Sequence, residues 1–191
     1  MSKTFVEEMI EAGKGSFLLL IGRRNAGEYF DLGLRGLAGS FIALLLATTF
    51  TAYLPGIMGQ NIGATGEVIT APAASQALFM SLILFGMQTG FGALALRQFG
   101  RIDGLMPYLV ADNWATFFAA ILFASLLAFN VNSDLVILSM GAIVLVSEIN
   151  ISRLIVTLKP IQIAMFIVAQ LVGALIGLMI LGSLFPGEIT G

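Results

Sequence analysis

Five apolar runs dominate this chain, and each is long enough to cross a lipid bilayer as one α-helix. The runs are about 23 to 25 residues long, and a helix that rises 1.5 Å per residue needs about 20 residues to span the hydrocarbon. They occupy residues 32–54, 73–96, 105–129, 135–158 and 161–185. Since 58% of the 191 residues are hydrophobic, no soluble domain of this size could bury them. The sequence therefore predicts an all-α integral membrane protein with five transmembrane helices.

Residues 1–31 precede the first run and are expected to form a leader with an amphipathic helix. Its apolar and acidic residues recur on opposite sides at helical spacing, as a helix lying on a membrane surface requires. The apolar side holds Phe5, Val6, Met9 and Ile10, and the other side holds Glu7, Glu8 and Glu11. A cytosolic leader that packs against the helix bundle is the alternative.

The positive charges predict the orientation of the chain. With the N-terminus in the cytoplasm, all 9 Lys and Arg residues fall at or near cytoplasmic ends of the apolar runs. The connections on the other side carry only the acids Glu67, Asp134 and Glu188. Five spans then place the C-terminus outside, with residues 186–191 as a short tail and residues 55–72 as a longer outer loop.

Polar residues inside the apolar runs are the candidate functional site. A charge near the centre of a membrane helix costs about 2.5 to 3.5 kcal/mol, so such residues usually face protein or water. Counting from the cytoplasmic ends places these residues at a depth of about 11 Å or less, on four helices. They are Arg35, Gln88, Asp112, Asn113, Glu148, Asn150 and Arg153.

Helical geometry suggests how the charges are paired. Glu148 and Arg153 lie about 140° apart around one helix, so each needs a partner on another helix. The expected pairs are Arg35 with Glu148 and Asp112 with Arg153, although either carboxyl could instead be protonated. These polar residues could hold the helices in register. Alternatively, they line a cytoplasmic cavity for a small solute, a lipid headgroup or protons, or they contact another membrane subunit.

Small residues spaced four apart predict where helices approach each other closely. We expect such pairs to form ordinary packing grooves within the bundle. The alternative is that they mark a contact with a second copy of this chain or with another membrane protein. The pairs are Gly36 and Ser40, Gly86 and Gly90, and Gly173 and Gly177.

Several function classes are disfavoured by what the sequence lacks. With no His and no Cys, the chain has no imidazole or thiolate for a metal site and no Ser-His-Asp or Cys-His arrangement. A formal net charge of −2 gives no basic footprint for nucleic acid. We therefore expect a non-enzymatic protein without a cofactor, whose first partner is the lipid bilayer.

Two short runs and the overall architecture resemble known families. The runs FDLGLRGLAGSF at residues 30–41 and YLVADNW at residues 108–114 are similar to small membrane proteins of alphaproteobacteria. Five spans with an inside N-terminus and one longer outer loop resemble the Yip1-type membrane protein family. The resemblance implies a bacterial inner membrane, with a periplasmic tail at residues 186–191. Eukaryotic members serve membrane traffic and small GTPases through a long cytosolic leader, and with residues 1–31 alone before the first run we do not expect that role here.

The sequence favours a scaffold or accessory subunit of a membrane assembly, acting through helix contacts. The alternatives are a transporter or binding protein for a small solute or ion, and a Yip1-like membrane-organising protein. A transporter would have its site at Arg35, Asp112, Glu148 and Arg153. An enzyme acting on membrane substrates ranks behind the scaffold and the transporter, because no nucleophile or metal spacing supports it.

Overall fold

The computed structural model describes residues 4–57, 74–129 and 133–185, and six α helices occupy them. They are α1 (Phe5–Leu20), α2 (Leu34–Ile57), α3 (Ala74–Gln98), α4 (Leu105–Ala128), α5 (Ser133–Asn150) and α6 (Pro160–Leu184). Helices α2 to α6 contain five segments long and apolar enough to cross a membrane. The prediction of an all-α chain with five long apolar helices is thus confirmed for the described residues.

The helix ends differ from the sequence boundaries by more than two residues at two places. Helix α2 continues through Pro55 and Gly56, where the first run was expected to stop. A proline this close to a helix end removes only one hydrogen bond from the last turn, so the helix tolerates it. The fourth run changes after α5 into a π-helical turn, Ile151–Ile155. The outer loop from residue 58 onward and the tail at residues 186–191 lie outside the described residues.

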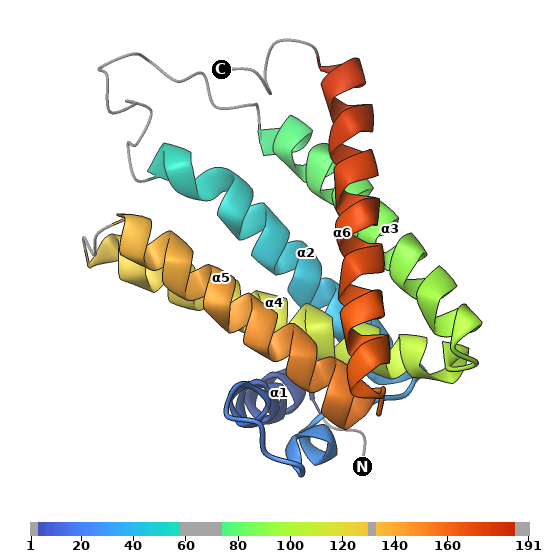
Figure 1. The fold of residues 1–191 in the computed structure, drawn as a ribbon. Helices are drawn as coiled ribbons and strands as arrows, with labels where there is room; N and C mark the ends of the chain where they lie inside the picture. Colours follow the sequence, from blue (N-terminus) through green and yellow to red (C-terminus); the bar gives the residue numbers. More distant parts are fainter. Residues whose placement is uncertain (1–3, 58–73, 130–132, 186–191) are drawn as a thin grey trace.

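The long helices form two arms that diverge from one end of the molecule (Figure 1). One arm is α3 packed along α6, and the other is α4 packed between α2 and α5. The α3–α4 and α5–α6 connections both cross from one arm to the other where the arms are closest. We call this the narrow end. In this view helix α1 lies below α4 and α5 and is seen nearly end-on, whereas the other helices are seen lengthwise.

Helix α1 buries one of its sides against the bundle. Ala12, Gly15 and Leu19 are buried against the bundle together with Glu8, while large apolar side chains on the other sides remain exposed. Phe5 still reaches the core at its edge, with its ring centroid 5.8 Å from that of Trp114. The exposed side chains are Phe5, Val6, Ile10, Phe17 and Ile21.

Glycine determines how closely the two helices of the α3–α6 arm approach. A Cβ atom on Gly173 would lie 2.5 Å from the backbone oxygen of Met87, and one on Gly177 would lie 3.0 Å from Leu84. Both glycines are buried, so the packing role predicted for this pair is confirmed. Gly86 and Gly90 differ, because they are exposed and a Cβ on either would meet nothing within 4 Å.

Candidate functional site

A cavity of about 490 Å³ lies between the two arms. Helices α3, α4, α5 and α6 all contribute to its wall, which combines seven polar with six apolar side chains. Its polar residues are Gln88, Thr89, Tyr108, Asp112, Thr116, Glu148 and Gln170. Its apolar side chains are Phe85, Met140, Val144, Leu145, Ile167 and Leu171. A wall of this kind is typical of ligand sites, whose volumes run from roughly 300 to 1,000 Å³.

Tyr108 joins three helices at this cavity. Its hydroxyl donates a hydrogen bond of 3.1 Å to Oε2 of Glu148 on α5 and accepts one of 2.6 Å from Nε2 of Gln170 on α6. Its ring meets Phe166 edge to face, with the centroids 5.0 Å apart. Because Tyr108 is in the first turn of α4, these contacts bridge the two arms close to the narrow end.

Two carboxyl groups share the cavity. Asp112 follows Tyr108 by four residues, so both lie on one side of α4. The carboxyl of Asp112 interacts electrostatically with that of Glu148 across the cavity. In the described part of the chain, Oε1 of Glu148 is buried and has no hydrogen-bond partner. Burying an unpaired carboxylate oxygen is costly, so the cavity is suited to a cation or a hydrogen-bond donor.

Three of the seven predicted site residues line this cavity, namely Gln88, Asp112 and Glu148. Two others act between helices elsewhere. Nδ2 of Asn113 donates to Oγ of Ser40 on α2 over 3.1 Å, and Nδ2 of Asn150 donates to the backbone oxygen of Leu19 in α1 over 2.8 Å. Neighbouring residues on a helix point about 100° apart, which is why Asn113 turns away from the cavity that Asp112 faces.

The two predicted ion pairs are wrong. The carboxyl of Glu148 contacts Tyr108 instead of Arg35, which is exposed at the start of α2. Arg153 does not reach Asp112, because it lines a separate pocket with Arg24. Arg153 belongs to the π-helical turn after α5, and it was already expected to lie on a different side of the helix from Glu148. Charge alone was therefore a poor guide to the partners.

Sequence reasoning missed Tyr108 and Gln170 as site residues. Gln170 is ten residues from the start of α6 at Pro160, and Gln88 is ten residues from the end of α3 at Gln98. The same depth counting, applied to amides in the last apolar run, would have placed Gln170 at the depth of the predicted site residues. Tyr108 gave no such signal, because a tyrosine near a membrane interface is common whether or not it binds anything.

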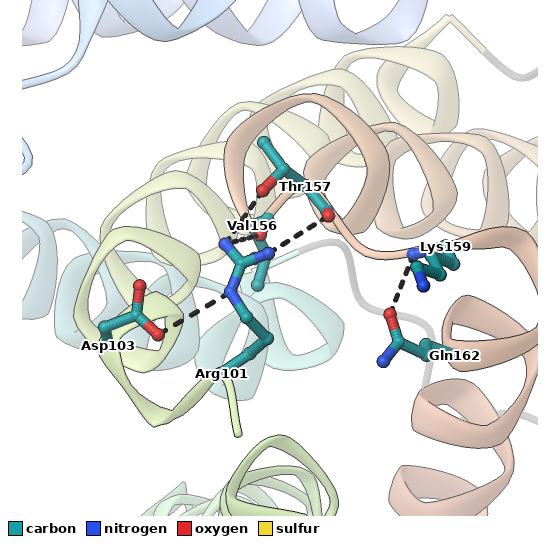
Figure 2. A network of polar contacts seen from close by, with 6 residues as sticks. All are labelled: Arg101, Asp103, Val156, Thr157, Lys159 and Gln162. Atoms are coloured by element: carbon teal, nitrogen blue, oxygen red, sulfur yellow. Dashed lines mark hydrogen bonds and ion pairs between the residues drawn. The ribbon is translucent and has the colours of Figure 1, made fainter. Parts of the chain in front are cut away.

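Arg101 ties together the two connections that link the arms (Figure 2). Its guanidinium donates to the backbone oxygen of Thr157 over 3.2 Å, to Oγ1 of Thr157 over 2.8 Å, and to the backbone oxygen of Val156. Asp103 lies on its other side, with 3.6 Å between Oδ1 and Nε. Thr157 has a φ of 60°, a left-handed conformation that costs about 1 to 2 kcal/mol for a residue with a side chain. Arg101 thus helps to hold a strained residue at the narrow end.

Comparisons with protein-family models, curated proteins and solved structures find no match to this chain. Among the described residues, no three His, Cys, Asp or Glu side chains are grouped so that they could hold a metal ion. The chemistry of the cavity is that of its own residues: two carboxyl groups, a phenol and several amides and hydroxyls, beside an apolar wall.

Proposed function

We propose that this protein is a membrane binding protein of the transporter type, whose cavity takes an amphiphile with a positively charged, hydrogen-bond-donating headgroup. The simplest such molecule is a long-chain primary ammonium ion. The observation that carries the proposal is Oε1 of Glu148, which is buried without a partner beside a second carboxyl group, Asp112.

Electrostatics support a cation as the occupant. Two carboxylates in one poorly solvated cavity repel each other, and an opposite charge between them removes the repulsion. Neither Asp112 nor Glu148 is ion-paired with an arginine or lysine of the described chain. An ammonium group carries three donors, so it can satisfy Oε1 of Glu148 and an oxygen of Asp112 together.

The apolar wall supports an amphiphile over a small hydrophilic cation. Met140, Val144 and Leu145 on α5 face Phe85 on α3 and Leu171 on α6 across the same cavity. A hydrocarbon tail placed between them would leave water, at about 25 cal/mol for each Å² of apolar surface buried. Met140 and Val144 precede Glu148 on α5 by eight and four residues, so a tail placed between these side chains would point away from the narrow end.

The arrangement of charge supports an orientation with the narrow end in the cytoplasm of a bacterial inner membrane. Arg97, Arg101, Arg153 and Lys159 all belong to the α3–α4 or α5–α6 connection or to the adjacent helix ends, as the positive-inside rule requires. Helix α1 crosses below α4 and α5 (Figure 1) and exposes Phe17 and other large apolar side chains. Both features fit a helix lying at the membrane surface.

A scaffold or accessory subunit is the second candidate, and the exposed face of α3 favours it. Gly86 and Gly90 form a small-residue pair there, and nothing within 4 Å covers either of them. A helix from another membrane protein or from a second copy of this chain could approach closely at this face. A Yip1-like organising role would use the same kind of contact.

Native mass spectrometry of the detergent-purified protein with three twelve-carbon ligands tests the proposal. Dodecylamine, dodecanol and dodecanoate share one tail and differ only in their headgroup. We expect one dodecylammonium ion per protein chain to be retained, dodecanol to be retained less, and dodecanoate not at all. Equal retention of all three would mean adsorption to apolar surface and would refute the proposal. A stable oligomer that Gly86→Leu abolishes, without ammonium binding, would favour the scaffold.

A further inference from the structure

A second pocket, of about 480 Å³, lies at the narrow end and is chemically the opposite of the cavity between the arms. It is lined by Gly22, Arg24, Arg153 and Leu154. The first two residues directly follow α1, and the other two belong to the π-helical turn after α5. Segments far apart in the sequence thus bring two arginines to one pocket.

The fold builds this pocket with specific contacts. Asn150 holds the end of α1 by donating to the backbone oxygen of Leu19 over 2.8 Å. Gly22 then turns the chain with a φ of 71°, which a residue with a side chain rarely adopts. A Cβ at Gly22 would lie 3.3 Å from Nη2 of Arg153, so this guanidinium lies directly over the turn. Arg24 follows two residues later and adds the second guanidinium.

The two guanidinium groups have unused donors. Among the described residues, neither the guanidinium of Arg24 nor that of Arg153 takes part in a hydrogen bond or an ion pair, and both side chains are exposed. Arg23 is also exposed and adds a third positive charge next to the pocket. Like charges held near each other favour an anion between them. Arginine binds phosphate oxygens with two parallel hydrogen bonds, which makes phosphate the best-matched anion.

We propose that this pocket binds the phosphate group of an anionic phospholipid. Leu154 in the pocket wall, and apolar side chains on the last turn of α1 and at its end, explain why the phosphate would belong to a lipid. Phe17 and Ile21 at the end of α1 are 62% and 50% exposed, and Leu154 lines the pocket itself. Acyl chains can lie against these side chains while the headgroup contacts the arginines. Basic pockets next to membrane helices commonly hold anionic headgroups in this way.

Native mass spectrometry with phosphatidylglycerol and phosphatidylcholine of equal chain length tests this site. The variants are Arg24→Gln and Arg153→Gln, and the control is Arg97→Gln, which removes an exposed arginine at the end of α3 near the same end of the molecule. We expect the protein to retain phosphatidylglycerol in preference to phosphatidylcholine. Each pocket variant should lower that retention by roughly tenfold, since a charge-assisted contact is lost, while the control retains it.

Three results would overturn the proposal. Equal loss in Arg97→Gln and in the pocket variants would mean that only total positive charge matters. If millimolar inorganic phosphate displaced phosphatidylglycerol and bound the protein as tightly as the lipid does, the pocket would be assigned to free phosphate. Arg24→Lys keeps the charge and the fold but not the paired hydrogen bonds, so retention at the level of the unaltered protein would also count against it. Size-exclusion chromatography verifies that each variant is folded.

Discussion

Arg101 donates a hydrogen bond of 3.2 Å to the backbone oxygen of Thr157, and so joins the α3–α4 connection to the α5–α6 connection. Each connection links one arm to the other, so this contact (Figure 2) lies where the two arms join and helps to hold the angle between them. The cavity between the arms depends on that angle. A residue remote from the cavity wall therefore supports the shape of the proposed binding site.

Replacing Arg101 by Met should lower the free energy of unfolding by about 1 to 3 kcal/mol, because the hydrogen bonds to Val156 and Thr157 are lost together. Thermal unfolding in detergent, followed by circular dichroism, measures the change. Arg97→Met is the matched control, since Arg97 is exposed at the end of α3. Equal destabilisation by both variants would show that Arg101 contributes only its charge.

Gly173→Ala should destabilise the α3–α6 arm, because the added Cβ would lie 2.5 Å from the backbone oxygen of Met87. Overpacking of this kind costs about 1 to 3 kcal/mol. Gly90→Ala is the control on the partner helix, since a Cβ there meets nothing within 4 Å, and its effect should be neutral or slightly stabilising. Unfolding in a series of sodium dodecyl sulfate mole fractions measures both. A harmless Gly173→Ala would contradict the observed packing.

The buried contact between Asn113 and Ser40 should couple α4 to α2. A double-mutant cycle of Ser40→Ala and Asn113→Ala should give a coupling energy of about 0.6 kcal/mol, and at most about 1.7 kcal/mol, as for other hydrogen bonds between membrane helices. Ser125 supplies a control, because its hydroxyl bonds within its own helix to Ile121. Coupling of Asn113 to Ser125 as strong as that to Ser40 would rule out a specific contact.

The number of long helices was predictable from the sequence because the bilayer sets their length. Runs of apolar residues that match about 30 Å of hydrocarbon have few other uses. The divergence of the arms was not predictable, because it depends on which helices pair. In lipid that choice follows close packing, such as Gly173 against Met87, and not a hydrophobic pattern along the chain. The π-helical turn at Ile151–Ile155 had no sequence signal either.

The candidate site was predictable in depth but not in detail. Counting residues from the helix ends brought Gln88, Asp112 and Glu148 to one level, and they do line one cavity. Opposite charge was then used to choose partners, and this failed because the partner of Glu148 is the neutral hydroxyl of Tyr108. Depth depends on one helix at a time, whereas partners depend on how several helices are rotated.

The affinity of dodecylammonium for the purified protein, measured by equilibrium dialysis, tests the central claim most directly. Glu148→Gln and Asp112→Asn should each raise the Kd by roughly tenfold or more, because a charge-assisted hydrogen bond contributes about 1.5 to 3 kcal/mol. Glu28→Gln removes the same charge from an exposed position outside the cavity and should leave the Kd unchanged. An unchanged Kd in the Asp112→Asn and Glu148→Gln double variant would contradict the claim that these carboxyl groups bind the ligand.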